Sequence, residues 1–405
     1  MRGERLWSRR RLVSACAGLT TVASAGCLRL TDDPTGTDAT DQEQPDPTES
    51  AAPVGDGGDS DTASATPPTD FDVELVPAWS AGSGSLTVAD GDFFFSVGDL
   101  RRVRPDGTTV FEAALPDGYF ASLSPTFRNA LHADDSGVYA GASPTDDGDI
   151  GARLYAFDPD SGAERWMYEE PADGLHDEIR AVTAVDNTVV YASQSSGSGD
   201  EQEPIVRGLD AASGDERWRI EPPAGFVNGI VVRGDRVFVH RTFELLVYRR
   251  PSGELLNEQR TGAGFTRLAT AGDTLVIPGD SIRALALPSG DERWSTPVDR
   301  EANTGVGVGQ RGVFFGTEAG YVLGYDGETG EKLWEERVAG VVEQPPIVAD
   351  GLVWVATERG DLSAFTEADG DLVYREEVAS GFEFVVQSGI LKHDERDTAY
   401  EIRRS

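Results

Sequence analysis

Cysteine and lysine are scarce in this 405-residue chain. It holds two cysteines, Cys16 and Cys27, and two lysines, Lys332 and Lys392, so almost all of its 35 basic residues are arginines. Two cysteines cannot build a disulfide framework. The bases are outnumbered by 71 acids, which gives a formal net charge of −36. Because phosphate contacts require basic patches, this charge argues against a nucleic-acid partner.

Long hydrophobic runs are also missing. The longest weakly apolar run, from Leu12 to Ala25, is shorter than the roughly 20 residues that a membrane-spanning helix needs. No later stretch reaches that length, so we expect no transmembrane helix. The hydrophobic content of 39% is nevertheless enough for a core. Since one ordinary core rarely exceeds about 250–300 residues, the chain is either multidomain or built from repeats.

The N-terminus has the features of an export signal. Arginines dominate the first eleven residues, and Arg9 and Arg10 lie in a Ser-Arg-Arg-Arg-Leu-Val segment that resembles the twin-arginine (Tat) motif. Ser24-Ala25-Gly26 before Cys27 resembles a lipobox, with Ser24 where leucine is usual. We therefore predict a Tat-type lipoprotein signal peptide over residues 1–26 and lipid attachment at Cys27. The alternative is plain cleavage at a small-residue site with Cys27 unmodified.

Residues 27–70 are rich in Asp, Thr, Pro, Ser and Gly and have almost no large apolar side chains. Such a segment cannot bury enough apolar surface to offset its ordering entropy. We predict a disordered acidic tether between the lipid and a folded domain. The protein would then be exported and anchored to the outer face of the cytoplasmic membrane.

The excess of acids continues through the whole chain. At about 1 M salt the Debye length is roughly 3 Å, which screens most of the repulsion within an acidic protein. The acidic, lysine-poor composition resembles that of haloarchaeal proteins. We therefore interpret the charge as an adaptation to concentrated salt.

One sequence unit recurs along residues 71–405. It consists of short β-branched or aromatic runs, a tight turn with glycine, and an aromatic residue four positions later. The turn glycines are Gly107, Gly162, Gly214, Gly253, Gly290, Gly330 and Gly370. The aromatic positions are Trp79, Phe111, Trp166, Trp218, Trp294, Trp334 and Tyr374, with Asn257 in the fourth repeat. A period near 40 residues with strands throughout indicates propeller blades of four strands each.

The two ends of the repeat region complete the count of blades. The chain stops after three strands of a last blade, whereas residues 73–79 form an orphan strand with no blade before it. We predict that this N-terminal strand completes the last blade and closes an all-β, eight-bladed propeller of four-stranded antiparallel blades. The first two intervals between glycines are longer than the others, and we assign the extra residues to loops at 143–151 and 193–204.

The repeat motif resembles the pyrroloquinoline-quinone-like (PQQ-like) β-propeller repeat. Ala156, Asp158, Ser161, Gly162 and Trp166 carry the resemblance in the clearest copy. It implies that each tryptophan docks on the small residue of the neighbouring blade. Two copies depart from the pattern, because Arg101 and Val247 replace the small residue and Asn257 replaces the aromatic.

Members of that family are quinone-dependent dehydrogenases or non-enzymatic scaffolds, among them a lipoprotein of bacterial outer-membrane assembly. The dehydrogenases use adjacent cysteines and a metal held by carboxylates, and this sequence has no paired cysteines. We predict a monomeric, non-catalytic scaffold without a cofactor, which binds another cell-surface or membrane protein or an extracellular ligand. The alternative is a quinone-dependent dehydrogenase-like enzyme, or another enzyme or solute-capture protein, that uses the central channel with PQQ or Ca²⁺.

Three other patterns favour structural interpretations. Residues 307–312 spell G-x-G-x-x-G, but an apolar strand follows where a dinucleotide-binding loop needs a helix, so we predict a β-turn. Residues 146–149 form an acidic loop without the ligand spacing of a calcium loop. The histidines His132, His176, His240 and His393 are scattered, with no pair at metal-ligand spacing.

Overall fold

The computed structural model describes residues 72–80, 83–96, 98–121, 123–124, 128–145, 150–171, 175–195, 202–262, 268–300, 302, 304–378, 383–394 and 396–405. The predicted signal peptide with Arg9 and Arg10, Cys27, the predicted tether and the acidic loop at 146–149 lie outside these residues. The chain divides into two compact units, Met1–Ala65 and Thr66–Ser405, and every described residue belongs to the second. No helix in the described part is long and apolar enough to cross a bilayer.

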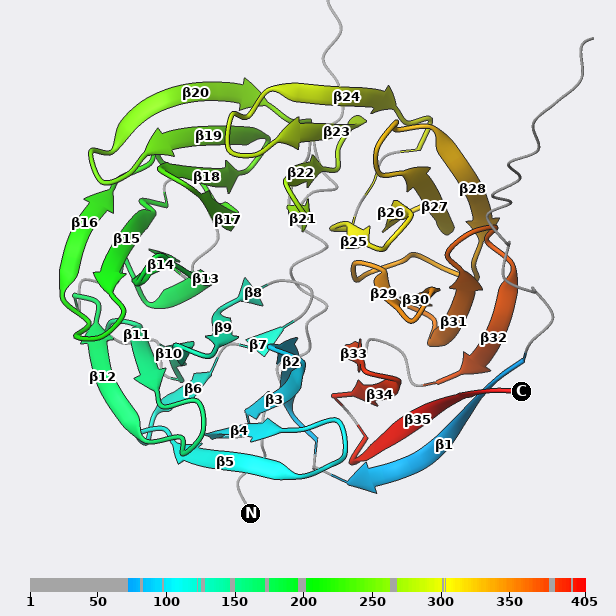
Figure 1. Cartoon of the computed structure of the whole chain (residues 1–405), viewed down its shortest axis with the longest axis horizontal. Helices are drawn as coiled ribbons and strands as arrows, with labels where there is room; N and C mark the ends of the chain where they lie inside the picture. The colour runs from blue at the N-terminus through cyan, green and yellow to red at the C-terminus, as the bar shows by residue number, and fades with distance from the viewer. Residues whose placement is uncertain are drawn as a thin grey trace, which may run out of the picture. The chain divides into compact units, whose positions relative to one another are not determined.

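The second unit is an eight-bladed β-propeller, which confirms the predicted fold (Figure 1). In each blade the first strand lies nearest the centre of the ring and the fourth lies at the rim. Five blades are four-stranded sheets in simple chain order: β2 (Ser85–Ala89), β3 (Asp92–Ser96), β4 (Asp99–Val103), β5 (Thr109–Ala114) in blade 1; β17 (Val227–Arg233), β18 (Arg236–Arg241), β19 (Glu244–Arg249), β20 (Glu254–Arg260) in blade 4; β21 (Ala269–Ala271), β22 (Thr274–Ile277), β23 (Ser281–Ala286), β24 (Glu292–Pro297) in blade 5; β25 (Gly307–Val308), β26 (Gly312–Gly316), β27 (Tyr321–Asp326), β28 (Lys332–Arg337) in blade 6; and β29 (Ile347–Ala349), β30 (Leu352–Ala356), β31 (Asp361–Thr366), β32 (Leu372–Glu377) in blade 7.

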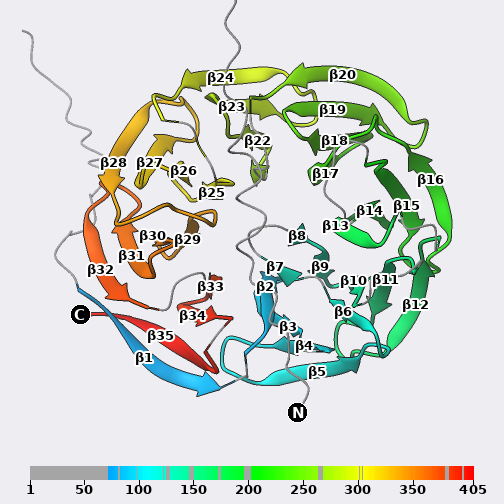
Figure 2. The same ribbon diagram turned by 180° about the vertical axis from the view of Figure 1, so that it is seen from behind.

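Blade 8 is built from both ends of the repeat region. β33 (Phe384–Gln387), β34 (Ile390–His393) and β35 (Thr398–Arg404) come from the C-terminus, and β1 (Val73–Ser80) adds the fourth strand. β1 runs antiparallel to β35, from Val73 opposite Arg404 to Ser80 opposite Thr398. The two strands lie side by side at the rim, blue against red, in both views (Figure 2). The predicted closure by the N-terminal strand is confirmed.

Blades 2 and 3 carry extra short strands. Blade 2 contains β6 (Tyr119–Ala121), β9 (Leu131–Asp134), β10 (Gly137–Pro144), β11 (Arg153–Phe157) and β12 (Glu164–Glu169); blade 3 contains β7 (Leu123–Ser124), β8 (Arg128–Asn129), β13 (Glu178–Val185), β14 (Thr188–Gln194), β15 (Ile205–Asp210) and β16 (Glu216–Ile220). β6 and β9 each pair with one end of β10. The sequence predicts that the extra residues between Gly107 and Gly162 lie in the loop at 143–151. Some of them instead lie in residues 119–129, where buried Tyr119, Ala121 and Leu123 attach the segment to the core.

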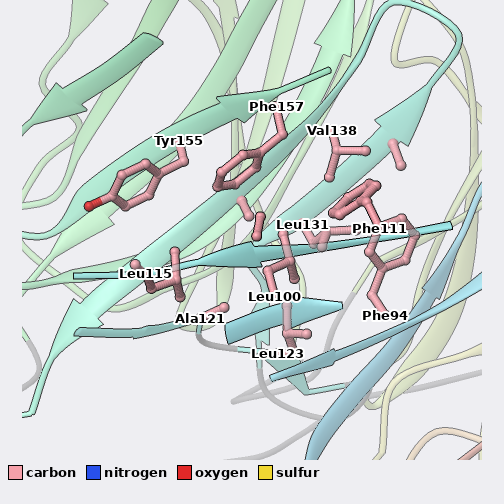
Figure 3. Packing of buried hydrophobic residues seen from close by; sticks show 14 of the residues in the cluster. Phe94, Leu100, Phe111, Leu115, Ala121, Leu123, Leu131, Val138, Tyr155 and Phe157 are labelled. Carbon is pink, nitrogen blue, oxygen red and sulfur yellow. The ribbon is translucent and has the colours of Figure 1, made fainter. Parts of the chain in front are cut away.

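The core lies between successive blades. The middle strands present β-branched and aromatic side chains to the blades on both sides, as the apolar runs predict. Between blades 1 and 2, Phe94 and Leu100 pack against Val138, Tyr155 and Phe157 (Figure 3). Each such side chain contributes roughly 1.5–3 kcal/mol when fully buried. The ring is therefore stabilised at each interface between adjacent blades, which we call a seam. Each blade depends on its two neighbours.

Candidate functional site

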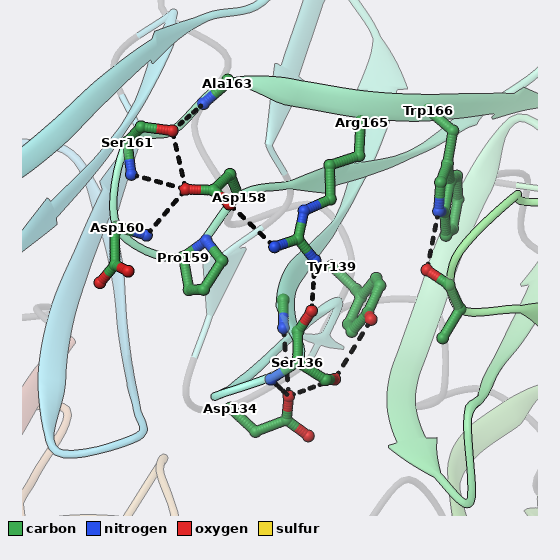
Figure 4. A network of polar contacts seen from close by, with 12 residues as sticks. Asp134, Ser136, Tyr139, Asp158, Pro159, Asp160, Ser161, Ala163, Arg165 and Trp166 are labelled. Carbon is green, nitrogen blue, oxygen red and sulfur yellow. Dashed lines mark hydrogen bonds and ion pairs between the residues drawn. The ribbon is translucent and has the colours of Figure 1, made fainter.

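A network of hydrogen bonds and an ion pair organises the turn between the third and fourth strands of the repeat (Figure 4). In blade 2, Asp158 Oδ1 accepts hydrogen bonds from the backbone N–H of Ser161 at 2.9 Å and from its hydroxyl at 2.7 Å. Asp158 Oδ2 pairs with Arg165 Nη2 at 2.8 Å. The hydrogen bonds from Arg165 and then from Ser161 hold the pKa of the Asp158 carboxyl well below its usual range. The network fixes the turn and engages both oxygens of the Asp158 carboxylate.

The small residue of the motif lies opposite the aromatic of its own blade. Ala156 pairs with Trp166 and Gly208 with Trp218, each next to a β-bulge. The resemblance implied that each tryptophan docks on the small residue of the neighbouring blade, and the structure places that residue in the tryptophan's own blade. In blade 1 the residue opposite Phe111 is Arg102 and not Arg101, because the turn from Val103 to Thr109 is one residue shorter than the turn from Phe157 to Glu164 in blade 2.

Each docked tryptophan instead meets the glycine turn of the next blade. The indole Nε1 of Trp166 donates to Ala211 O at 2.9 Å. A Cβ added to Gly214 would lie 2.8 Å from Trp166 Cδ2, so only glycine fits. Three further tryptophans donate to turn carbonyls of the next blade in the same way: Trp79 to Pro105, Trp294 to Gly327 and Trp334 to Glu367. Phe111 packs under Gly162 without such a bond.

Three of the predicted docking positions, those of blades 3, 4 and 7, lack this contact with the glycine turn of the next blade. No atom of Trp218 comes within 4 Å of a Cβ added to Gly253, and the nearest atom to one on Gly290 is Phe238 Cε1 at 3.5 Å. Tyr374 packs against Trp354, with ring centroids 5.6 Å apart, and its hydroxyl donates to Glu376. The third and fourth strands of blade 8 are β35 and β1, which come from opposite ends of the repeat region, so the described residues contain no glycine turn between them on which Tyr374 could dock.

Replacing Gly214 with alanine should destabilise the ring by about 2–4 kcal/mol. Its φ of +78° is costly for any L-residue, and the new methyl group would collide with Trp166. Gly351→Ala is the matched control, because Gly351 has a φ of +72° but no neighbour within 4 Å of an added Cβ. The free energies of unfolding of the two variants in urea separate the cost of the collision with Trp166 from the cost of placing alanine at a positive φ. Equal losses would show that docking on Gly214 contributes nothing.

A buried ion pair joins blades 2 and 3. Glu170 follows β12, and its carboxylate pairs with Arg207 of β15, with 2.8 Å between Oε2 and Nη2. Tyr191 Oη and Ser193 Oγ donate to Glu170 Oε1 at 2.8 and 2.7 Å. Burial alone would lower the pKa of Arg207, but its bonds to Glu170 and the charge of that carboxylate raise it. The sequence analysis missed this network, although an arginine inside the apolar strand Ile205–Asp210 was a signal for it.

Lys392 of β34 is fully buried. Its ammonium donates to His393 O at 2.6 Å and to Arg396 O, and it lies 5.5 Å from the centre of the Phe95 ring. Burial lowers the pKa of Lys392 to about 8. None of the side chain is exposed, and it lies against Phe95 of blade 1, so we assign it to the packing of blade 8 against blade 1.

Removing Lys392 should make stability less dependent on pH. Its pKa in the folded state, about 8, is below the value of 10.5 that is usual for a lysine side chain. Between these pH values only the unfolded state takes up the proton, so the folded state gains stability as pH rises. Lys392→Met should therefore lose this rise, about 3 kcal/mol in all. Urea midpoints from pH 7.5 to 10 measure it, with Lys332→Met, at an exposed side chain, as control. Parallel curves for wild type and Lys392→Met would refute the assignment.

Three large apolar side chains are exposed on one face of the ring. Ile150, Leu175 and Phe243 are 39%, 41% and 52% exposed. Ile150 and Phe243 lie between second and third strands, and Leu175 lies in the connection from blade 2 to blade 3. In an antiparallel blade these connections emerge on the face opposite the glycine turns. We call it the loop face; the predicted long loops at 143–151 and 193–204 also connect second to third strands.

The described residues do not converge as a metal or dinucleotide site. No group of three or more His, Cys, Asp or Glu side chains in the described part could hold a metal ion. The G-x-G-x-x-G segment is the hairpin between β25 and β26, as predicted, and its Arg311 N–H donates to Glu367 Oε1 at 2.6 Å.

Sequence comparisons match parts of this chain to outer membrane protein assembly factors. Residues 278–394 match the family model described as outer membrane protein assembly factor BamB. The protein of that name from Nitrosomonas eutropha is 35% identical over 86 residues, which cover 21% of this chain and 21% of that protein. The one from Yersinia pestis is 22% identical over 240 residues, covering 50% of this chain and 58% of that protein. The matches thus span less than two thirds of these relatives' length.

Solved structures show the same fold. BamB from Moraxella catarrhalis aligns with a TM-score of 0.58 at 14% identity, over 82% of this chain and 97% of that one. A quinohemoprotein alcohol dehydrogenase from Pseudomonas putida aligns with a TM-score of 0.58 at 12% identity, over 79% and 71%. At these identities the likeness concerns the fold alone. Together with the sequence matches, it supports a PQQ-like propeller family for this chain, with BamB proteins among its relatives.

Proposed function

We propose that this chain is a non-catalytic scaffold that holds another membrane or cell-surface protein on its loop face. The observation that carries the proposal is the exposure of Ile150, Leu175 and Phe243 on one face of three adjacent blades. Exposed apolar patches rimmed by polar residues mark protein-binding surfaces, and these three are the exposed large apolar side chains of the loop face among the described residues. The match to outer membrane protein assembly factors supports a role in protein interaction. The dehydrogenase alternative is supported by likeness of fold alone.

Site-specific photo-crosslinking on intact cells tests the scaffold. A photoreactive residue is placed at Leu175 or Phe243 on the loop face, or at Leu333, which is 39% exposed on the rim strand β28. We expect the first two to capture the same protein and Leu333 to capture none. Capture from Leu333 alone, or from no position, would reject the loop face as the contact surface.

We also propose that the propeller is tethered to the membrane by a lipid on Cys27 and works in concentrated salt. The Tat-like arginines, the lipobox-like segment and the net charge of −36 support this setting. Cys27→Ser should move the protein from the membrane fraction to the medium, because the anchor is lost while the ring is unchanged. Fractionation of cells that express both forms, with Cys16→Ser as the control, measures it. A Cys27→Ser protein that stays with the membrane would contradict the anchor.

A further inference from the structure

The seam between blades 3 and 4 differs from the other tryptophan seams. Trp218 of β16 holds the place of the docked tryptophan, yet no hydrogen-bond acceptor for its indole nitrogen is found among the described residues. A Cβ added to Gly253 would be nearest to Ile220 Cγ1, at 3.6 Å. The turn of blade 4 therefore stands away from the indole that it would cover in a regular seam.

A groove of about 490 Å³ opens at this place. Trp218, Pro251 and Thr188 contribute to its lining, and its charged side chains are Arg217, Arg250, Asp186 and Asp235. Its two cations and two anions cancel, in a chain whose net charge is −36. A highly charged ligand would therefore gain little here.

The guanidinium groups beside the groove are already engaged. Arg250 Nη2 pairs with Asp186 Oδ2 at 2.6 Å, and its Nε donates to Gly234 O at 2.7 Å. Arg217 pairs with Asp210 and donates to Thr188 Oγ1 at 2.9 Å. Trp218 lines the groove but is only 9% exposed, so the groove offers a small part of its ring and an indole N–H that has no acceptor among the described residues. Such a site fits an uncharged group that carries a carbonyl oxygen.

We propose that this groove binds a glycine-containing β-turn of a partner protein. The other seams of the same ring show the complement: a turn glycine over the indole, and a turn carbonyl that accepts the indole N–H. At Trp218 the indole N–H has no acceptor among the described residues, a small part of the ring is exposed, and the turn of blade 4 is withdrawn. The groove is formed by hairpin and turn residues on the face opposite the loop face, so the proposal does not rest on the scaffold proposal.

A hairpin peptide tests the groove. The probe carries residues 206–216, the turn that receives Trp166, closed by flanking cysteines and free of tryptophan. Calorimetric titration into the full chain should show saturable binding. Trp218→Phe should weaken it about tenfold, because the ring is kept but the donor is lost. Trp294→Phe is the matched control: it removes a donor already bonded to Gly327 O, so it should lower thermal stability and leave peptide binding unchanged.

Two further measurements keep the test decisive. Asp235→Trp places a bulky side chain over the groove and should abolish binding while Trp218 stays in place. A peptide with valine at the turn glycine should fail to bind the wild-type chain. No binding by the wild type, or equal binding by wild type and Trp218→Phe, would overturn the proposal.

Discussion

Deleting residues 71–80 should abolish the cooperative unfolding transition of the ring. The deletion removes β1, so the pairing with β35 is lost and blade 8 has an open edge. It also removes Val73 and Leu75 from the core of blades 7 and 8, and Trp79 from its place against Gly107. At roughly 1.5–3 kcal/mol for each buried side chain, the loss approaches the whole stability of a typical domain, about 5–15 kcal/mol.

Circular dichroism during urea unfolding measures this loss. Deleting residues 41–50 is the control, because it shortens the predicted tether by the same number of residues without touching β1. A synthetic peptide of residues 71–82 added to the truncated chain should restore the transition, since the strand is joined to the ring only by pairing and packing. An unchanged transition in the truncated chain would refute the closure as a source of stability.

Glu170→Ala should cost about 3–5 kcal/mol of unfolding free energy. The variant leaves the guanidinium of Arg207 buried and without the carboxylate that holds it, and it removes the acceptor of Tyr191 and Ser193. Glu169→Ala is a close control. Glu169 precedes it in sequence and pairs with Arg153 at 3.1 Å at the surface, so its loss should cost at most about 1 kcal/mol.

A double variant measures the coupling energy between Glu170 and Arg207. Glu170→Ala with Arg207→Met should be less destabilising than the sum of the single changes, because removing both charges leaves neither buried alone. Urea midpoints of the four proteins give the coupling. Additive losses, or a Glu170→Ala cost no larger than that of Glu169→Ala, would show that the ion pair does not stabilise the seam.

The fold could be predicted from the sequence because most of the repeats carry the same pattern. The glycine turns and the aromatic residues recur at a fixed distance, and an orphan strand at one end matched a missing strand at the other. The small residue of the neighbouring blade was the wrong docking partner for the tryptophan, because the motif does not say which residue the tryptophan contacts. The pairing of Arg102 with Phe111 was missed because the turn of blade 1 is one residue shorter than that of blade 2, and the position was counted back from the glycine.

The polar features were harder to predict. Glu170 is one of 71 acids in the sequence, and only the fold brings it to Arg207, 37 positions later. The same holds for the groove beside Trp218. In the sequence the blade 3 motif, with Trp218 four residues after Gly214, is as regular as that of blade 2, and the difference lies in the turn that faces it from blade 4.

The pairing of β1 with β35 sets the order of events during synthesis. Val73 is among the first residues of the ring to leave the ribosome, and its partner Arg404 follows more than 300 positions later. Seven blades can assemble while translation continues, but the eighth must wait until β35 has been synthesised. A product that stops before β35 would leave the pairing edge of β1 uncovered. The strand that is made first is therefore the last of the ring to be paired.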